Sequence, residues 1–329
     1  MVNSDQKMFS PQDTIGNENQ YVLKQLLIGF HNRWEAQGPK GLCHIHTFHL
    51  SKLSQFSDSR AAREQKSILR ELDRWRKVVT GRPQTLDLFW DGHTLCWVER
   101  VTVGAPLSSV NSPLSLYEGV SLIEECLCLL ELIHSERDFQ LGDPLLHLNI
   151  SPQNIWREEA GTLLLMHPSC PTLIELSAQQ SLSDDEALSG EVAPELLRGR
   201  YGMSSDLYAI GMSALSAMTG MSVARVDERL QAERLFSHDL DCPPAVEEFL
   251  KQLTAFRASA RYQSAREALI ALQSLPPLEP IKPTSYEPPL SETDQPSSDT
   301  SPKQLEVDST DETEIAIRRC HLRHLTESI

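Results

Sequence analysis

The sequence predicts an α+β protein with a strand-rich first part, a mainly helical second part and a disordered tail. From Tyr21 to about Val103, apolar and polar residues mainly alternate, which is typical of strands. After Gly104, long apolar segments have the spacing of buried helices. From Pro276 the chain is rich in Pro, Ser, Thr and acidic residues, a composition that does not support a packed core.

We therefore divide the chain of 329 residues into a polar leader, one bilobal domain and a tail. The leader covers residues 1–20. The domain covers residues 21–275, with a strand-rich lobe at about 21–101 and a helical lobe at about 102–275. The tail covers residues 276–329, and its last segment, from Glu314 to Ile329, has apolar and basic residues spaced for a short docking helix. A frayed end is the alternative for that segment.

The elements of the first lobe follow from their patterns. Strands are predicted at 21–28 and 43–53, a helix with a basic outer face at 59–79, and strands at 86–90 and 94–98. The last two strands are joined by Asp91-Gly92, a dipeptide that strongly favours a tight hairpin.

The second lobe begins with a long apolar helix at 114–135. Two short strands separated by a loop are predicted around 147–155 and 163–166. A second apolar helix, at 204–219, ends before Gly220, a residue that suits a helix C-cap. Further helices are predicted at 246–256 and 265–275.

Charge and hydropathy restrict the class of partner. The formal net charge is −16, so we expect neither nucleic acid nor an anionic membrane to be a partner. No apolar run reaches the 18 or more residues of a membrane span, and the N-terminus lacks the apolar centre of a signal peptide. These features predict a cytoplasmic protein whose partners are other proteins, as yet unidentified.

The cysteines and histidines do not form a metal-binding motif along the sequence. The seven cysteines are scattered, without a CxxC pair, so we expect reduced and mostly buried thiols. His44, His46 and His49 are closely spaced next to Cys43, but the spacing is not that of a zinc site. We therefore predict ordinary strand residues here and no metal.

Five segments in order resemble motifs of bacterial serine/threonine protein kinases. Residues 147–155, HLNISPQNI, are similar to the catalytic loop H-R-D-L-K-P-x-N-I. A short apolar strand then ends where kinases carry D-F-G, here 167–169. Ala193-Pro194-Glu195 matches A-P-E, residues 205–220 resemble the S-D-x-Y-x-x-G…T-G helix, and residues 261–265 resemble R-Y-x-S-A. The resemblance covers residues 21–275 and implies a bilobal protein-kinase-like fold.

The resemblance also implies contacts that hold the helical lobe together. The glutamate of A-P-E, here Glu195, is expected to pair with the late arginine, here Arg261. The aspartate of the long helix, here Asp206, is expected to hold the backbone of the catalytic loop near His147–Asn149.

The nucleotide site in the first lobe is harder to place. The kinase resemblance implies a lysine on the third strand that pairs with a glutamate on the following helix, and we expect Lys52 and Glu71, behind a loop at Gly29. The alternative register has His46 and Glu64 in these roles. Glu99 matches the hinge, where backbone groups would meet an adenine.

Several positions depart from the kinase pattern in ways that remove chemistry. The position of the catalytic base is Asn149, whose amide cannot take up a proton at neutral pH. The metal position of D-F-G is His167, and a neutral imidazole is a poor ligand for Mg²⁺. Leu148 and Ser151 replace the arginine and lysine of the loop. Only Asn154 of the metal-binding pair is retained.

The glycine-rich loop is degraded as well. Gly29, His31 and Trp34 stand where kinases have three glycines, so the backbone cannot approach phosphates closely. We predict a pseudokinase that serves as a binding or regulatory module, with weak ATP binding at best and no Mg²⁺. The alternative is a weak or unconventional kinase that binds ATP through Lys52 and Asn154, and a third reading is an unrelated helical adaptor.

Overall fold

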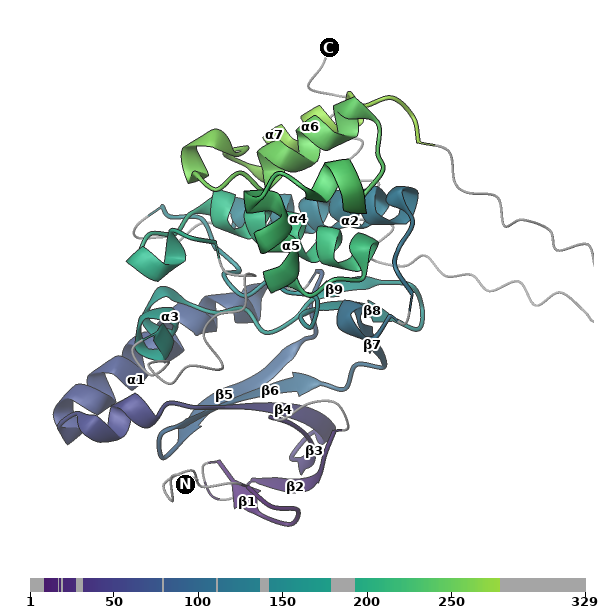
Figure 1. The fold of residues 1–329 in the computed structure, drawn as a ribbon. Coiled ribbons are helices and arrows are strands. Elements are labelled where there is room, and N and C mark those ends of the chain that lie inside the picture. Colours follow the sequence, from purple (N-terminus) through teal and green to yellow (C-terminus); the bar gives the residue numbers. More distant parts are fainter. Residues whose placement is uncertain are drawn as a thin grey trace, which may run out of the picture.

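A computed structural model describes residues 9–278, except 17, 19, 28–31, 79, 111, 137–141 and 179–192. The tail from 279 onward lies outside the described residues, as do Gly29, His31 and the first eight residues. Within the described residues, the chain forms a strand-rich part followed by a helical part (Figure 1).

Six antiparallel strands form the sheet of the first part, in the order β1-β2-β3-β4-β6-β5. The strands are β1 (Thr14–Ile15), β2 (Tyr21–Leu26), β3 (Arg33–Gly38), β4 (Gly41–His49), β5 (Thr85–Asp91) and β6 (Thr94–Arg100). The hairpin predicted at Asp91-Gly92 is present, and Gly92 has the left-handed backbone that the turn requires, with φ 60°.

Strand β4 is shorter than the strand that was predicted at 43–53. We expected a strand to run to Leu53, but β4 ends at His49 and the chain turns into a 3₁₀ segment, η2 (Ser51–Gln55). The amide of Leu50 still donates to the carbonyl of His93 in the register of β4 and β6, and the amide of Leu53 then donates to the carbonyl of Leu50 as the chain turns. Strand β3 was not predicted, although Trp34 and Ala36 alternate with polar residues in its sequence RWEAQG.

One helix accompanies the sheet. Helix α1 (Asp58–Asp73) and the 3₁₀ segment η3 (Arg74–Lys77) confirm the helix predicted at 59–79. A face of α1 buries Ala61, Ile68 and Leu72, and α1 projects to the side of the molecule in Figure 1.

The second part is built on helices α2 (Leu116–Ser135) and α4 (Met203–Thr219), which pack against each other. A capping box at Ser115 starts α2, where the Ser115 hydroxyl accepts from the amide of Glu118. A small sheet holds β7 (Gly104–Pro106), β8 (Ile155–Glu158) and β9 (Leu163–Leu165). The remaining helices are α3 (Pro171–Ala178), α5 (Val223–Gln231), α6 (Pro244–Leu253) and α7 (Ala265–Gln273).

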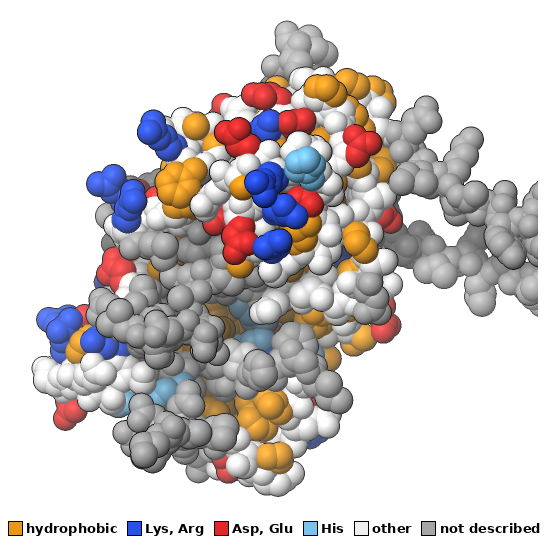
Figure 2. Space-filling view, in the orientation of Figure 1, with side chains coloured by type: hydrophobic (Ala, Val, Ile, Leu, Met, Phe, Trp, Pro, Cys, Tyr) orange, Lys and Arg blue, Asp and Glu red, His pale blue; other side chains and the backbone are white. Residues whose placement is uncertain are grey.

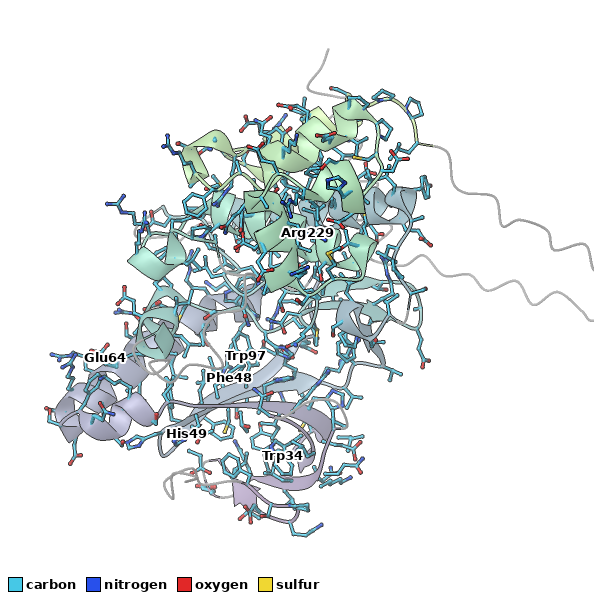
Figure 3. All side chains as sticks on the ribbon, viewed as in Figure 1. Trp34, Phe48, His49, Glu64, Trp97 and Arg229 are labelled. Atoms are coloured by element: carbon cyan, nitrogen blue, oxygen red, sulfur yellow. The ribbon has the colours of Figure 1, made fainter. Side chains whose placement is uncertain are left out.

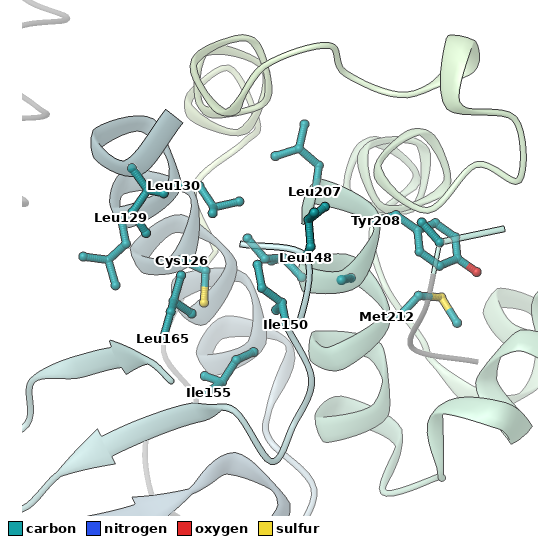
Figure 4. Packing of buried hydrophobic residues seen from close by; sticks show 14 of the residues in the cluster. Cys126, Leu129, Leu130, Leu148, Ile150, Ile155, Leu165, Leu207, Tyr208 and Met212 are labelled. Atoms are coloured by element: carbon teal, nitrogen blue, oxygen red, sulfur yellow. The ribbon is translucent and has the colours of Figure 1, made fainter. Parts of the chain in front are cut away.

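Two apolar clusters lie on opposite faces of the large sheet. The main core joins α2, α4 and the catalytic-loop segment through residues such as Cys126, Leu148 and Leu207 (Figure 4). Trp97 faces this core, whereas Trp34 belongs to a smaller cluster on the outer face of the sheet (Figure 3). The inner face of the sheet therefore looks toward the helical part, and any site between the two parts lies there.

Two further expectations can be checked in the described residues. The six cysteines among them carry free thiols, and five of these are buried. Among the described helices, none alone is long and apolar enough to cross a membrane, although α4 and α5 together, bent by 99°, meet that length and composition.

Candidate functional site

The segment that resembles a catalytic loop is held by a buried carboxylate. The Asp206 side chain, on α4, accepts hydrogen bonds from the backbone amides of His147 and Leu148 at 2.8 and 2.7 Å. It also bonds His134 Nε2 at 2.9 Å. The contact that the kinase resemblance implied for Asp206 is therefore present.

Two residues of the site have an uncommon backbone conformation. Leu148 has φ 57° and His167 has φ 52°, in the left-handed region that residues with side chains rarely adopt. Such conformations cost on the order of 1–3 kcal/mol and persist where the surrounding structure imposes them, most often at functional sites.

The residues at the positions of the catalytic base and the metal ligands form hydrogen bonds with one another instead. Asn149 Nδ2 donates to the backbone carbonyl of His167 at 2.6 Å. Asn154 Nδ2 donates to the carbonyl of Asn149 at 2.8 Å, and Asn154 Oδ1 lies 3.2 Å from His167 Nδ1. The two amides and the imidazole thus form a closed network without any carboxylate.

His167 also meets the sheet of the first part. Its ring lies 3.4 Å from that of His46 on β4, measured between centroids. Its Nε2 lies 3.6 Å from Glu99 Oε2, and Glu99 Oε1 accepts from Arg82 Nη2 at 2.7 Å. His46, Glu99 and His167 are 2%, 0% and 6% exposed, so this group is closed to solvent.

A second arginine lies beside this group. Arg33 on β3 is 1% exposed, its Nη2 lies 2.9 Å from His44 Nδ1, and its guanidinium stacks 4.6 Å over the ring of Trp156. Histidine side chains are visible in the recess between the two parts of the molecule (Figure 2). A long cationic side chain and two imidazoles therefore fill part of the inner face of β3 and β4.

Burial and the two arginines control the protonation of this group. Burial, with His167 and Arg33 nearby, lowers the pKa of His46 well below its ordinary value. Burial, then Arg33 and Arg82, do the same for the pKa of His167. Burial raises the pKa of Glu99 against the opposing effect of Arg82, and burial lowers the pKa of Arg33 to about 10. Both imidazoles are consequently neutral at pH 7.

The expected lysine–glutamate pair requires a correction of register. Lys52 does not lie on β4, the strand that was expected to carry it, but in η2, after β4 has ended. His46, opposite Trp97 in the ladder, has the strand position that faces His167. The shorter β4 is the physical reason, because it leaves Lys52 beyond the inner face of the sheet.

The two candidate glutamates are occupied elsewhere. Glu71 Oε1 accepts from Thr172 Oγ1 at 2.7 Å and from Ser67 Oγ at 3.1 Å, which ties α1 to α3. Glu64 lies on α1 with Arg60 Nε 4.0 Å away. Gly29 lies outside the described residues. Glu99 was expected at a hinge, but its side chain points into the buried group with Arg82.

A small cavity also borders the loop. It has a volume of about 50 Å³ and is lined by residues that include Asn149, Ser151 and Asp206. A space of this size holds a few water molecules and is too small for a nucleotide.

The sequence reasoning missed three members of the site: Arg33, Arg82 and Trp156. None was a candidate site residue in the sequence analysis, and β3 itself was not predicted. Arg82 carried a weak signal, since Arg82-Pro83-Gln84 stands where kinases often have H-P-N.

The helical part carries the other implied ion pair. Arg261 Nη1 and Nη2 bind the two carboxylate oxygens of Glu195 at 2.7 and 3.0 Å. Ser205 Oγ adds a third hydrogen bond to Glu195 at 2.8 Å. These contacts lie where the kinase resemblance placed them.

Comparison with known proteins gives related kinases. No family model matches the chain. The serine/threonine-protein kinase PknA of Nostoc sp. is 28% identical over 198 residues, which are 56% of this chain and 34% of that protein. Serine/threonine-protein kinase B of Synechocystis sp. is 24% identical over 204 residues, 58% of this chain and 34% of that protein. The matches thus span about a third of each curated relative.

Solved structures agree on the fold. The PknI kinase domain of Mycobacterium tuberculosis superposes with a TM-score of 0.56 at 15% identity, covering 81% of this chain and 98% of that domain. The apo form of PpkA-294 gives a TM-score of 0.58 at 15% identity, covering 80% and 99%. The chain is therefore a homologue of bacterial serine/threonine-protein kinases and has the fold of a kinase domain.

Proposed function

We propose that this kinase-like domain does not transfer phosphate and acts as a binding or regulatory module for a protein partner. The observation that carries the proposal is the closed network of Asn149, Asn154 and His167. In a kinase, a carboxylate at the position of Asn149 would orient the attacking hydroxyl, and a carboxylate at the position of His167 would hold Mg²⁺.

The network cannot replace those carboxylates. The Asn149 amide uses its N–H to bind the carbonyl of His167, and an amide does not accept a proton at neutral pH. A neutral, buried imidazole is a poor ligand for the hard Mg²⁺ ion. Electrostatic groups of this kind contribute roughly 3–4 kcal/mol each to the transition state, so the loss of both removes most of the rate.

The surroundings of His46 support weak nucleotide binding at best. The strand position that would offer a cationic lysine to phosphates carries a neutral histidine. Arg33, held over Trp156 and against His44, fills the inner face next to it. A nucleotide would have to displace this buried group before it could bind.

What remains intact is the framework. The Glu195–Arg261 pair and the Asp206 contacts hold the helical part and the loop in place. A domain that keeps its fold and lacks its phosphate chemistry suits the recognition of another protein. The partner is a protein and not a nucleic acid, because the net charge of the chain is −16.

The experiment is an assay with radiolabelled ATP and Mg²⁺ on the purified full chain, beside an Asn154→Ala variant. We expect no incorporation of label in either protein, and a thermal shift with ATP that is small and does not depend on Mg²⁺. Autophosphorylation that is clear in the natural protein and lost in the variant would overturn the proposal. It would favour the weak kinase instead, with a carboxylate in the missing role, such as Glu175 on α3 or Asp184, which lies outside the described residues.

A further inference from the structure

The buried group between the two parts contains three ligand atoms with no partner. His46 Nε2, Glu99 Oε2 and His167 Nε2 are buried and have no hydrogen-bond partner. One ligand atom from each of these three residues lies within 4.8 Å of a ligand atom of the other two. Buried polar atoms are nearly always satisfied, and three unpartnered atoms on neighbouring buried side chains require an explanation.

We propose that these three atoms form a site for a divalent transition-metal ion of the Zn²⁺ class. Two imidazoles and one carboxylate are a donor set that Zn²⁺ uses with a fourth position left open. The distance of 3.6 Å between His167 Nε2 and Glu99 Oε2 is close to the spacing of about 3.3 Å expected for two ligands at about 2.0–2.1 Å from a tetrahedral ion.

The groups around the ligands orient them for this role. Asn154 Oδ1 lies 3.2 Å from His167 Nδ1, so an N–H there would point to Asn154 and leave the lone pair of Nε2 toward the site. Arg82 binds Glu99 Oε1 and leaves Oε2 toward the histidines. Outer partners of this kind fix the tautomer and direction of metal ligands.

The site would connect elements that are distant in the sequence. His46 comes from β4, Glu99 from β6, and His167 follows β9. An ion held by all three would tie the large sheet to the segment after the small sheet. It would lie near the D-F-G position but would use imidazoles, which suit Zn²⁺, Co²⁺ and Ni²⁺, where Mg²⁺ prefers oxygen.

Two positive charges oppose the ion and provide a diagnostic. Arg33 and Arg82 both act on His167, and Arg82 is neutralised by its pair with Glu99. Replacing Arg33 with Met removes one repulsive charge and keeps much of the side-chain length. If a cation binds here, Arg33→Met binds it more tightly; if the group instead recognises an anion, the same change weakens binding.

The experiment uses the full chain without an affinity tag, stripped of metal by a chelator. Zn²⁺ and Co²⁺ are titrated by calorimetry and by visible absorption, and inorganic phosphate is titrated in parallel. We expect one ion per chain, a tetrahedral Co²⁺ spectrum and a rise in melting temperature with Zn²⁺. His46→Phe and His167→Leu should each weaken binding at least tenfold, and Asn154→Leu by about 10- to 100-fold as an outer partner.

Two controls separate the site from adventitious binding. His93→Ala removes a histidine of the hairpin between β5 and β6, and His238→Ala removes an exposed one; both lie outside the three ligands and should leave the affinity unchanged. If the ligand variants fail to fold, X-ray absorption on the Zn²⁺-loaded natural protein still decides, because the first shell must contain two imidazoles. The absence of one-to-one binding would overturn the proposal. So would an affinity of the His46 and His167 variants equal to that of the natural protein, or tighter binding of phosphate than of metal.

Discussion

Arg261 binds both carboxylate oxygens of Glu195, at 2.7 and 3.0 Å, from a position where its own side chain is fully buried. Arg261 also donates to the backbone carbonyls of Ser204, Ala255 and Phe256. One guanidinium thus connects the segment before α4 with the turn that follows α6.

We predict that Glu195→Gln strongly destabilises the domain, because it leaves the buried guanidinium without its counter-ion. Breaking a buried pair in this way costs roughly 3–5 kcal/mol. The value here should fall at the lower end, since Glu195 keeps some exposure. Urea unfolding measures it, with Glu228→Gln in the exposed Arg225–Glu228 pair as the matched control, where the expected change is below about 1 kcal/mol. Equal midpoints for the two variants would contradict the prediction.

Acid should destabilise the protein through its buried histidines, and His147 is the best case. Burial lowers the pKa of His147 to about 4, whereas the unfolded chain keeps the ordinary value of 6.5. Above pH 6.5 neither state binds a proton at this residue. Between pH 6.5 and 4, His147 binds a proton in the unfolded state but not in the folded state. The free energy of unfolding therefore decreases as the pH falls.

The largest contribution of His147 is about 3 kcal/mol, since each pKa unit corresponds to about 1.4 kcal/mol. Replacing His147 with Phe keeps an aromatic ring beside Trp75, with which the histidine makes an edge contact. The unfolding free energy of this variant should decrease less steeply from pH 6.5 to 4. Parallel pH profiles for both proteins would show that His147 is not responsible.

The close approach of α4 to α6 depends on a glycine. A methyl group added at Gly211 would lie 2.5 Å from Cγ2 of Thr254 and 3.2 Å from Leu253. Thr254 is buried, and its hydroxyl bonds the carbonyl of Leu250, so it cannot turn away freely. We expect Gly211→Ala to destabilise the domain by about 1–3 kcal/mol through overpacking.

Gly119 provides the comparison for this prediction. A methyl group there would lie 2.2 Å from Sδ and 2.3 Å from Cγ of Met218, an unbranched and flexible side chain that can move aside. Gly119→Ala should therefore cost less than Gly211→Ala in the same chemical unfolding experiment. The reverse order would mean that α4 and α6 adjust more easily than their contact suggests.

Restoring a single carboxylate should not create a kinase. Asn149→Asp returns the base, but a carboxylate cannot donate the hydrogen bond that Asn149 now makes to the carbonyl of His167. We expect no phosphate transfer and a loss of stability of about 1–3 kcal/mol from the unsatisfied carbonyl. His167→Asp alone should be inactive as well, because groups that act as a unit are strongly non-additive. Transfer by either single variant, measured with radiolabelled ATP, would contradict this.

The sequence alone determined the fold and the supporting contacts of the helical part. The motifs around His147, Glu195, Asp206 and Arg261 lie in segments whose order along the chain is fixed, and apolar periodicity placed the long helices near them. Such signals lie within short stretches of sequence, so they can be recognised without knowledge of the tertiary structure.

The tertiary structure decided which residues meet inside the site. The length of β4 could not be read from the sequence, because strand ends depend on pairing, and this length puts His46 rather than Lys52 opposite His167. No carboxylate lies near His46 in the sequence, yet the ladder between β4 and β6 and the turn after β9 bring Glu99 and His167 to it. Contacts between distant segments follow from register and packing, and these are properties of the folded chain as a whole.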